Sequence, residues 1–123
     1  MATIEVDQQA VNVTLSRWER PFAGGRTRIV VPRSAVRASE RVDRPTRWAA
    51  TPGGRAGLLI TGVLKLGRWG IGTRTSRFVS VRRWVPALRL ALDEAIAEQL
   101  GYDELLISTP DVDRITGALA SPQ

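Results

Sequence analysis

Hydrophobic and polar residues alternate along the first part of the chain. The segment AVNVTLS, residues 10–16, places its three large apolar side chains on one face, and residues 2–7 alternate in the same way. A period of two predicts strands with one buried face. The connection, residues 7–9, is short enough for a hairpin although it contains no glycine. We therefore expect the chain to begin with two paired strands.

Most of the remaining pattern also predicts strands. Residues 17–25 break the alternation, and a single helical turn there would bury Trp18 and Phe22, which lie four positions apart. Residues 44–56 hold two prolines, two glycines and Trp48, and are predicted to form a loop. Segments rich in β-branched and apolar residues predict strands at 27–31, 36–43, 58–66, 77–84 and 104–108.

The last third of the chain carries two helical patterns. Apolar residues recur at helical spacing from about Pro86 to Leu100, with Gly101 as a stop, but residues 87–92 also alternate as a strand would. The ending is clearer, because Thr109-Pro110-Asp111 has the order of cap, first helical residue and acid that begins a helix. Val112, Ile115 and Leu119 then share a face that would pack on a sheet.

Composition narrows the class of protein. A chain of 123 residues with 43% hydrophobic residues is one domain, 1–123, able to bury a core. It has neither histidine nor cysteine, so it lacks the usual general base, the commonest metal ligand and thiolate nucleophiles. Adjacent carboxylates such as Asp93-Glu94 diverge on an extended chain and make a poor catalytic pair. We expect no enzyme activity and no cofactor.

Charge is distributed unevenly. Residues 1–16 sum to −2, residues 17–89 to +14 and residues 90–123 to −6, which returns the total of +6. All but one of the 18 basic residues are arginine. Arginine binds phosphate and carboxylate in bidentate fashion, which favours an anionic partner for the middle segment. A GC-rich genome would produce the same arginine content with no function attached.

Four stretches carry a likeness to a known class. They are VTLSRWER (13–20), IVVPRSAVRASERVD (29–43), LGRWGIGTRTSRFVSVRR (66–83) and YDELLISTPDVDRITGAL (102–119). Together they resemble the uncharacterised bacterial, actinobacterial-type, pleckstrin-homology-like (PH-like) domains. The resemblance implies a mainly β fold with one C-terminal α-helix: a barrel of about seven strands in two roughly orthogonal antiparallel sheets, capped by helix 110–120.

The resemblance also bears on the ambiguous segment and on ligands. It implies that residues 87–92 form a strand hairpinned to 77–84, and that 94–101 form a loop with at most one helical turn. Eukaryotic members bind phosphoinositides through a lysine-rich loop between the first two strands. Here that connection, residues 7–9, carries no basic residue, so the resemblance does not extend to phosphoinositide binding.

One group of residues suggests a binding surface. Arginines and aromatics gather around a glycine-rich connection and the strand after it, and such sets hold phosphate by charge and rings by stacking. The run GRWGIG at 67–72 lacks the lysine-serine pair of a phosphate-binding loop and is predicted to be a bulged turn. The candidate residues for an anionic partner are Arg68, Trp69, Arg74, Arg77, Arg82, Arg83 and Trp84. The competing interpretation is that the arginines are ordinary surface residues and that Trp69 and Trp84 cover the ends of the barrel.

The functional expectation is a non-catalytic binding or scaffold module. Its partner would be a protein or an anionic lipid surface, and the alternative is a nucleic-acid-binding protein that uses the same basic surface. The N-terminus lacks the features of a secretion signal and no apolar run is long enough to span a membrane. We therefore expect a cytoplasmic protein, peripheral to the membrane if lipid is the partner. The oligomeric state is left open, since an exposed sheet edge can pair with a second copy.

Overall fold

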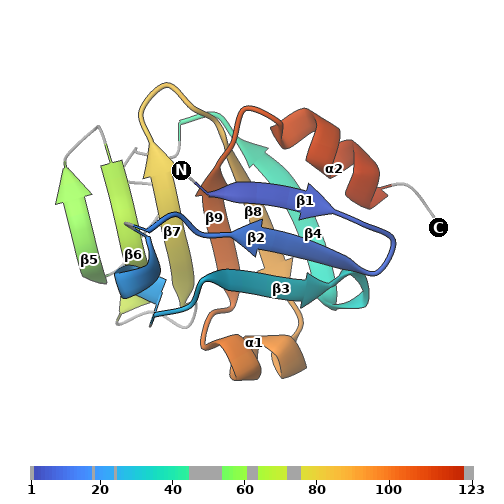
Figure 1. Cartoon of the computed structure of the whole chain (residues 1–123), viewed down its shortest axis with the longest axis horizontal. Helices are drawn as coiled ribbons and strands as arrows, with labels where there is room; N and C mark the ends of the chain where they lie inside the picture. Colours follow the sequence, from blue (N-terminus) through green and yellow to red (C-terminus); the bar gives the residue numbers. More distant parts are fainter. Residues whose placement is uncertain are drawn as a thin grey trace.

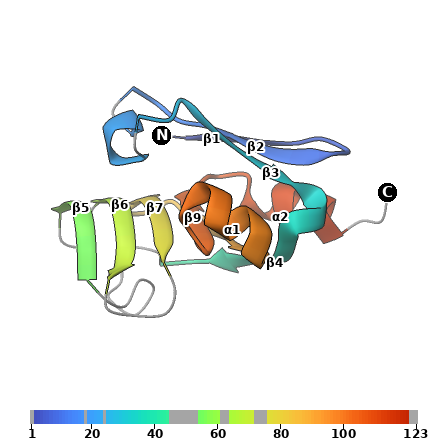
Figure 2. The same cartoon turned by 90° about the horizontal axis from the view of Figure 1, so that it is seen from below.

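The computed structural model describes residues 2–17, 19–23, 25–44, 54–60, 64–71 and 76–120, with the backbone alone described at 22, 54–60, 64, 68–71 and 120. Within these residues the fold is mainly β. A three-stranded sheet lies across one face of a six-stranded sheet, and two α-helices flank the pair (Figure 2). The strands of the two sheets run in steeply different directions (Figure 1).

The first sheet is an antiparallel meander of β1 (Thr3–Val6), β2 (Ala10–Thr14) and β3 (Arg28–Pro32). The predicted hairpin is confirmed, with Val6 opposite Val11. An aspartate replaces the missing glycine at the turn, because the Asp7 carboxylate accepts hydrogen bonds of 2.7 Å from the backbone N–H groups of Gln9 and Ala10. These bonds, the one from Gln9 foremost, hold the pKa of Asp7 below its ordinary 3.8.

The second sheet has the strand order β4-β8-β9-β7-β6-β5. Its neighbouring strands are antiparallel except β7 and β9, which are parallel. The bounds are β4 Val36–Val42, β5 Gly54–Ile60, β6 Leu64–Ile71, β7 Arg77–Arg82, β8 Ala87–Leu92 and β9 Glu104–Ser108. Short 3₁₀ turns precede β3 and β4, namely η1 Arg20–Ala23 and η2 Arg33–Ala35.

Three features of the expected barrel are wrong. The sheets do not close into a barrel, and they are not wholly antiparallel. In addition, β8 is not hairpinned to β7, because β9 lies between them. The composition of β9 explains this insertion: Leu105, Leu106 and Ile107 are at most 1% exposed, so both faces of the strand are buried. A strand that is apolar on both faces is stable in the interior of a sheet rather than at its edge.

The strand predicted at 58–66 is also wrong. The chain reverses between Ile60 and Leu64, so this segment contributes to two paired strands, β5 and β6. The following glycine-rich run, predicted to be a bulged turn, continues β6 as far as Ile71. Gly67 lies within that strand at a φ of 134°, in the region that favours glycine.

The ambiguous segment contains both predicted structures in succession. Residues 87–92 form β8, as the resemblance implied, and α1 (Glu94–Leu100) follows as a second helix that the fold class had not included. Asp93 caps α1 by accepting a 3.0 Å hydrogen bond from the backbone N–H of Ile96. Gly101 ends it in the left-handed conformation with a φ of 83°.

The core lies between the two sheets. The predicted inward face of β2 and the helical residues Val112 and Ile115 all belong to it. The final helix, α2 (Val112–Ala120), begins two residues later than predicted and packs against β4, β1 and β8. The predictions for Trp18, Trp48, the side chain of Phe22 and the loop at 45–53 lie outside the described residues.

Two arginines fasten the three-stranded sheet to the helices. Arg26 donates a 2.9 Å hydrogen bond to the carbonyl of Leu100 in the last turn of α1. Arg33 donates a 2.8 Å bond to the carbonyl of Ala118 in the last turn of α2. Carbonyls at the C-terminal end of a helix lack partners within the helix and carry partial negative charge. Both arginines therefore have a structural role.

Candidate anionic-partner surface

The turn that joins β7 to β8 is a four-residue β-turn, Arg82–Val85. The backbone N–H of Val85 donates to the carbonyl of Arg82 across the turn. Trp84 has a φ of 70°, and no other described non-glycine residue has a positive φ. A positive φ at the third position of a β-turn is typical of a type II turn, where glycine is the usual residue. A bulky aromatic residue there is strained, which points to a role for its side chain.

The base of this turn is held rigidly by β9. The Ser108 hydroxyl accepts a 2.9 Å hydrogen bond from the backbone N–H of Arg82 and donates a 3.2 Å bond to the carbonyl of Val85. The backbone N–H of Thr109 donates to the carbonyl of Pro86 just beyond the turn. Ser108 is fully buried, so these bonds are shielded from water. The turn is fixed although it projects from the sheet.

The side chains of the turn are presented to solvent. Trp84 is 85% exposed, whereas large apolar side chains are usually buried. The guanidinium carbon of Arg83 lies 4.4 Å from the centroid of the Trp84 ring, within the range of a cation–π contact. Arg82 is exposed as well. The turn therefore combines an open aromatic ring with two cations.

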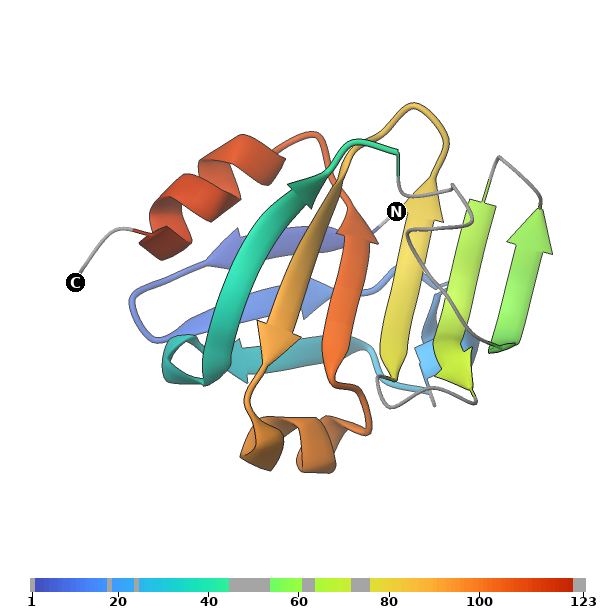
Figure 3. The ribbon, with the colours of Figure 1, turned by 180° about the vertical axis from the view of Figure 1, so that it is seen from behind.

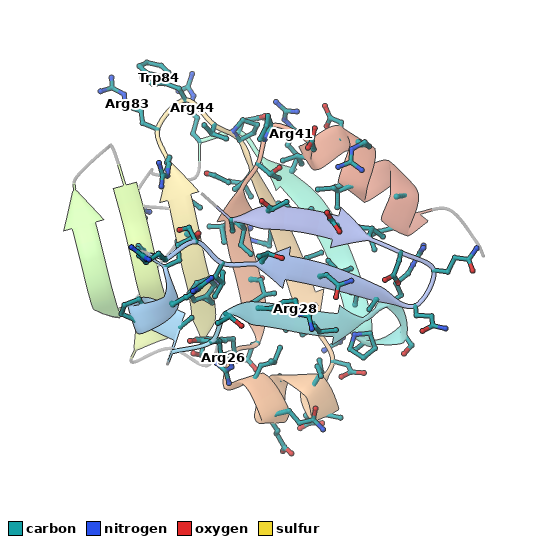
Figure 4. All side chains as sticks on the ribbon, viewed as in Figure 1. Arg26, Arg28, Arg41, Arg44, Arg83 and Trp84 are labelled. Atoms are coloured by element: carbon teal, nitrogen blue, oxygen red, sulfur yellow. The ribbon has the colours of Figure 1, made fainter. Side chains whose placement is uncertain are left out.

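A third cation comes from a distant part of the sequence. β4 and β8 pair so that Val42 lies opposite Ala87, which brings the end of β4 beside the turn. Figure 4 shows the exposed side chain of Arg44 at the same end of the molecule as Arg83 and Trp84. We call Arg44, Arg82, Arg83 and Trp84 the basic tip. None of its three arginines forms an ion pair with a described residue.

Arg41 is near the tip but is already neutralised. Its guanidinium lies 2.6 Å from Asp43 and 2.8 Å from Asp113 on α2. The hydrogen bonds to Asp43 and then to Asp113 raise the pKa of Arg41 above its ordinary value. This residue therefore links β4 to α2 and does not add free charge to the tip.

The predicted site residues divide between the two ends of β7. The structure brings together Arg82, Arg83 and Trp84 but places Arg77 at the opposite end of the strand, next to Trp69 in the backbone register. Arg77 lies on the same face of β7 as Val79 and Val81, away from the core between the sheets. The side chains of Arg68 and Trp69, and all of Arg74, lie outside what the structure describes.

Arg77 belongs to an ion-pair network instead. Its Nε lies 2.7 Å from Glu104 on β9, and Arg89 on β8 lies 3.9 Å from the same carboxylate and 2.7 Å from Glu40. The side chains of Arg77 and Glu104 are 14% and 17% exposed. A nearby cavity of about 550 Å³ is lined by two arginines and three carboxylates among other residues. This mixed charge does not favour an anion.

Sequence reasoning missed two features of the tip. Arg44 was assigned to a loop, and only the register of β4 on β8 places it beside the turn. The positive φ of Trp84 was also missed, because this residue was predicted to lie at the end of a strand. A signal was present in VRRWVP, where two arginines and a tryptophan precede a proline that marks a turn.

The basic tip presents cations and an aromatic ring to an anionic partner, but it has no groups for acid–base chemistry near neutral pH. Its charged groups are guanidiniums, which stay protonated. Within the described ranges, three or more acidic side chains do not gather in a way that would hold a metal ion. Neither of the two helices is long and apolar enough to cross a membrane. Comparisons with protein-family models, curated proteins and solved structures found no match to this chain.

Proposed function

We propose that this protein is a non-catalytic binding module of the PH-like class that attaches to an anionic lipid surface through the basic tip. The observation that carries the proposal is Trp84, 85% exposed in a backbone conformation normally given to glycine. Exposed arginines flank it on the same rigid turn. The non-catalytic part rests on the composition of the whole chain, which has no histidine and no cysteine.

The shape of the tip favours a lipid surface over a protein. A stable protein interface needs about 800 Å² from each partner, and a single projecting turn offers little area. Attachment to a bilayer does not need an interface of this size. A single tryptophan side chain can insert at the level of the lipid headgroups. Arginine pairs with lipid phosphate, and each basic residue near an anionic membrane contributes about 1 kcal/mol. Attachment would be peripheral, through the side chains of the tip alone.

The PH-like part of the proposal rests on the four sequence stretches named above. It is further supported by a final helix that packs on the sheets, through Val112 and Ile115. The open sheets and the parallel pairing of β7 with β9 are departures from that class. The lipid-binding part does not depend on this relationship, because it is argued from the tip.

Vesicle co-sedimentation tests the lipid proposal. We expect the wild-type protein to sediment with vesicles containing phosphatidylglycerol and to remain in solution with phosphatidylcholine alone. Arg82→Glu/Arg83→Glu should weaken binding to anionic vesicles at least 30-fold, an order-of-magnitude value from the loss of two cations. Trp84→Ala should weaken it as well while leaving the charge unchanged.

A matched control separates the tip from net charge. Arg28→Glu/Arg37→Glu changes two exposed arginines on β3 and β4 and lowers the net charge from +6 to +2, as the tip variant does. Figure 4 shows Arg28 well away from the tip. This control should keep most of the binding. Equal binding to neutral vesicles, or equal loss in both double variants, would contradict the proposal.

The nucleic-acid alternative makes a different prediction with the same proteins. The Trp84 ring would stack on a base, and affinity would fall steeply with salt as phosphate contacts release counterions. A gel shift of single-stranded DNA or RNA at low salt, abolished in the tip variant, would favour that alternative if vesicle binding were absent. An acidic protein partner would be indicated by the loss of a captured protein in the tip variant but not in the matched control.

A further inference from the structure

The edges of the two sheets differ in how well they are protected. An edge strand exposes unpaired backbone N–H and C=O groups, and proteins blunt such edges with charge, proline, bulges, short strands or a covering element. β4 carries three charged residues, an irregularity in register after Val36, and α2 beside it. β1 has only four residues and includes Glu5, and β3 ends in Pro32. These three edges are protected.

As far as the described residues show, the fourth edge, β5, lacks this protection. Its sequence, GRAGLLI, has seven residues, a single charge at Arg55, no proline and no lysine, and it ends in three consecutive apolar residues. Its one irregularity in register lies at the start, between Gly54 and Arg55. β5 pairs with β6 alone, and no described strand lies on its other side. Figures 1 and 3 show it at the far end of the sheet.

We propose that β5 pairs antiparallel with β5 of a second copy of this chain, so that the six-stranded sheet continues across a two-fold axis. The strand is compatible with itself. If the axis passes through Gly57, Arg55 lies opposite Leu59 of the other copy, and the two arginines are about 13 Å apart along the strands. Glycine would meet glycine at the centre, where the backbones are closest. Such an interface uses the same surface of both copies.

The dimer is tested by its mass and by a pair of matched substitutions. Sedimentation equilibrium from micromolar to near-millimolar concentration should give twice the mass of one chain. Leu59→Glu places a carboxylate opposite the partner's Arg55, and Leu59→Lys places a like charge there. Each dimer contains two such pairs, so the dissociation constant should fall roughly 2- to 30-fold in the first variant and rise in the second. Both variants replace the same apolar residue by a charge.

The control lies on the other edge of the same sheet. Ala38→Lys on β4 should leave the dimer unchanged, and circular dichroism should show that each variant remains folded. If a Leu59 variant unfolds, Ala56→Lys gives a second test, since the register places residue 56 only two positions along from the partner's residue 56, and two like charges there should raise the dissociation constant. A monomeric mass at every concentration would overturn the proposal. So would a dimer that responds to Ala38→Lys and not to the sign of the charge at position 59.

Discussion

Among the described residues, Trp84 differs most clearly from an ordinary tryptophan in its exposure and its backbone conformation. It is exposed, its φ is 70°, and a guanidinium covers its ring. A non-glycine residue in the left-handed region costs about 1 to 3 kcal/mol, and an exposed ring returns little of this through burial. A stabilising change should therefore be available at the same residue that the binding proposal needs.

Replacing Trp84 by glycine should separate stability from binding. Trp84→Gly relieves the strained φ, so we expect the free energy of unfolding to rise by about 1 kcal/mol in urea denaturation. Binding to anionic vesicles should fall, because the ring is lost. Trp84→Ala is the control, since it removes the ring but keeps a Cβ in the strained conformation and should not stabilise. A glycine variant less stable than the alanine variant would contradict this account.

Lys65 is the second unusual residue. Its side chain is 4% exposed on β6, where it lies opposite Val81 of β7. Desolvation by burial lowers the pKa of Lys65 from 10.5 to about 8. Between these values the unfolded chain holds a proton that the folded chain has released, so stability rises with pH there. Below pH 8 the amine is charged in the folded protein as well, at a site where burial disfavours the charge.

Substitution of Lys65 by methionine should remove this pH dependence. We expect the pH-dependent contribution of Lys65 to the free energy of unfolding to be on the order of 1 to 3 kcal/mol. The wild type should gain stability as the pH rises from about 8 to 10.5, and the variant should lack this gain. Denaturant unfolding of both proteins at about pH 7 and pH 10 measures how much each gains in stability. The other titrating groups are the same in both proteins, so their contributions cancel when the two gains are subtracted. A variant that gains as much stability between these two pH values as the wild type does would contradict this account of Lys65.

At the scale of elements, the arginine content has a partly structural explanation. Arg26 and Arg33 bond to the final carbonyls of α1 and α2, and so tie both helices to the first sheet. Arg33 also donates a 3.2 Å hydrogen bond to the carbonyl of Asp7 at the β1–β2 turn. Neither codon bias nor a binding surface is needed to account for these residues.

Loss of the Arg33 contacts should destabilise the chain. Arg33→Ala removes hydrogen bonds to Ala118 and Asp7, and bonds from a charged donor contribute about 1.5 to 3 kcal/mol each at most sites, less where solvent reaches them. We expect a loss of about 2 kcal/mol in the free energy of unfolding, measured in urea. Arg37→Ala, a change of the same type on exposed β4, should cost less than about 0.5 kcal/mol. Equal losses in the two variants would remove the helix-fastening role.

For the whole molecule, folding redistributes the charge that is so uneven along the sequence. The basic middle segment and the acidic C-terminal segment meet in space through Arg41 with Asp113, and through Arg77 and Arg89 with Glu104. Three arginines of the basic segment are therefore paired with two carboxylates of the acidic segment within the fold. The basic tip keeps three arginines without such partners among the described residues, at the end of the six-stranded sheet away from α1.

The elements that the sequence predicted correctly are those with a strong local pattern. β1, β2 and β9 were located by alternation or by a short apolar run, and α2 by its cap and apolar face. The failures occurred where one local pattern fits two structures. Residues 58–66 form an apolar run that reads equally well as one strand or as parts of a hairpin, and 87–100 contains a strand followed directly by a helix. The hydrophobic pattern gives little indication of a turn that lies within an apolar run.

The sequence by itself determined that the fold is mainly β, that a final helix packs through its apolar face, and where along the chain the cationic and aromatic residues lie. Only the tertiary structure decided the order of strands, because neighbours in a sheet are chosen by burial over long sequence separations. That order inserts β9 between β7 and β8, uses Ser108 to hold the turn, and brings Arg44 beside it. It also places Arg77 in an ion pair with Glu104. A binding surface depends on which charges remain without partners, and this is settled only when distant segments have met.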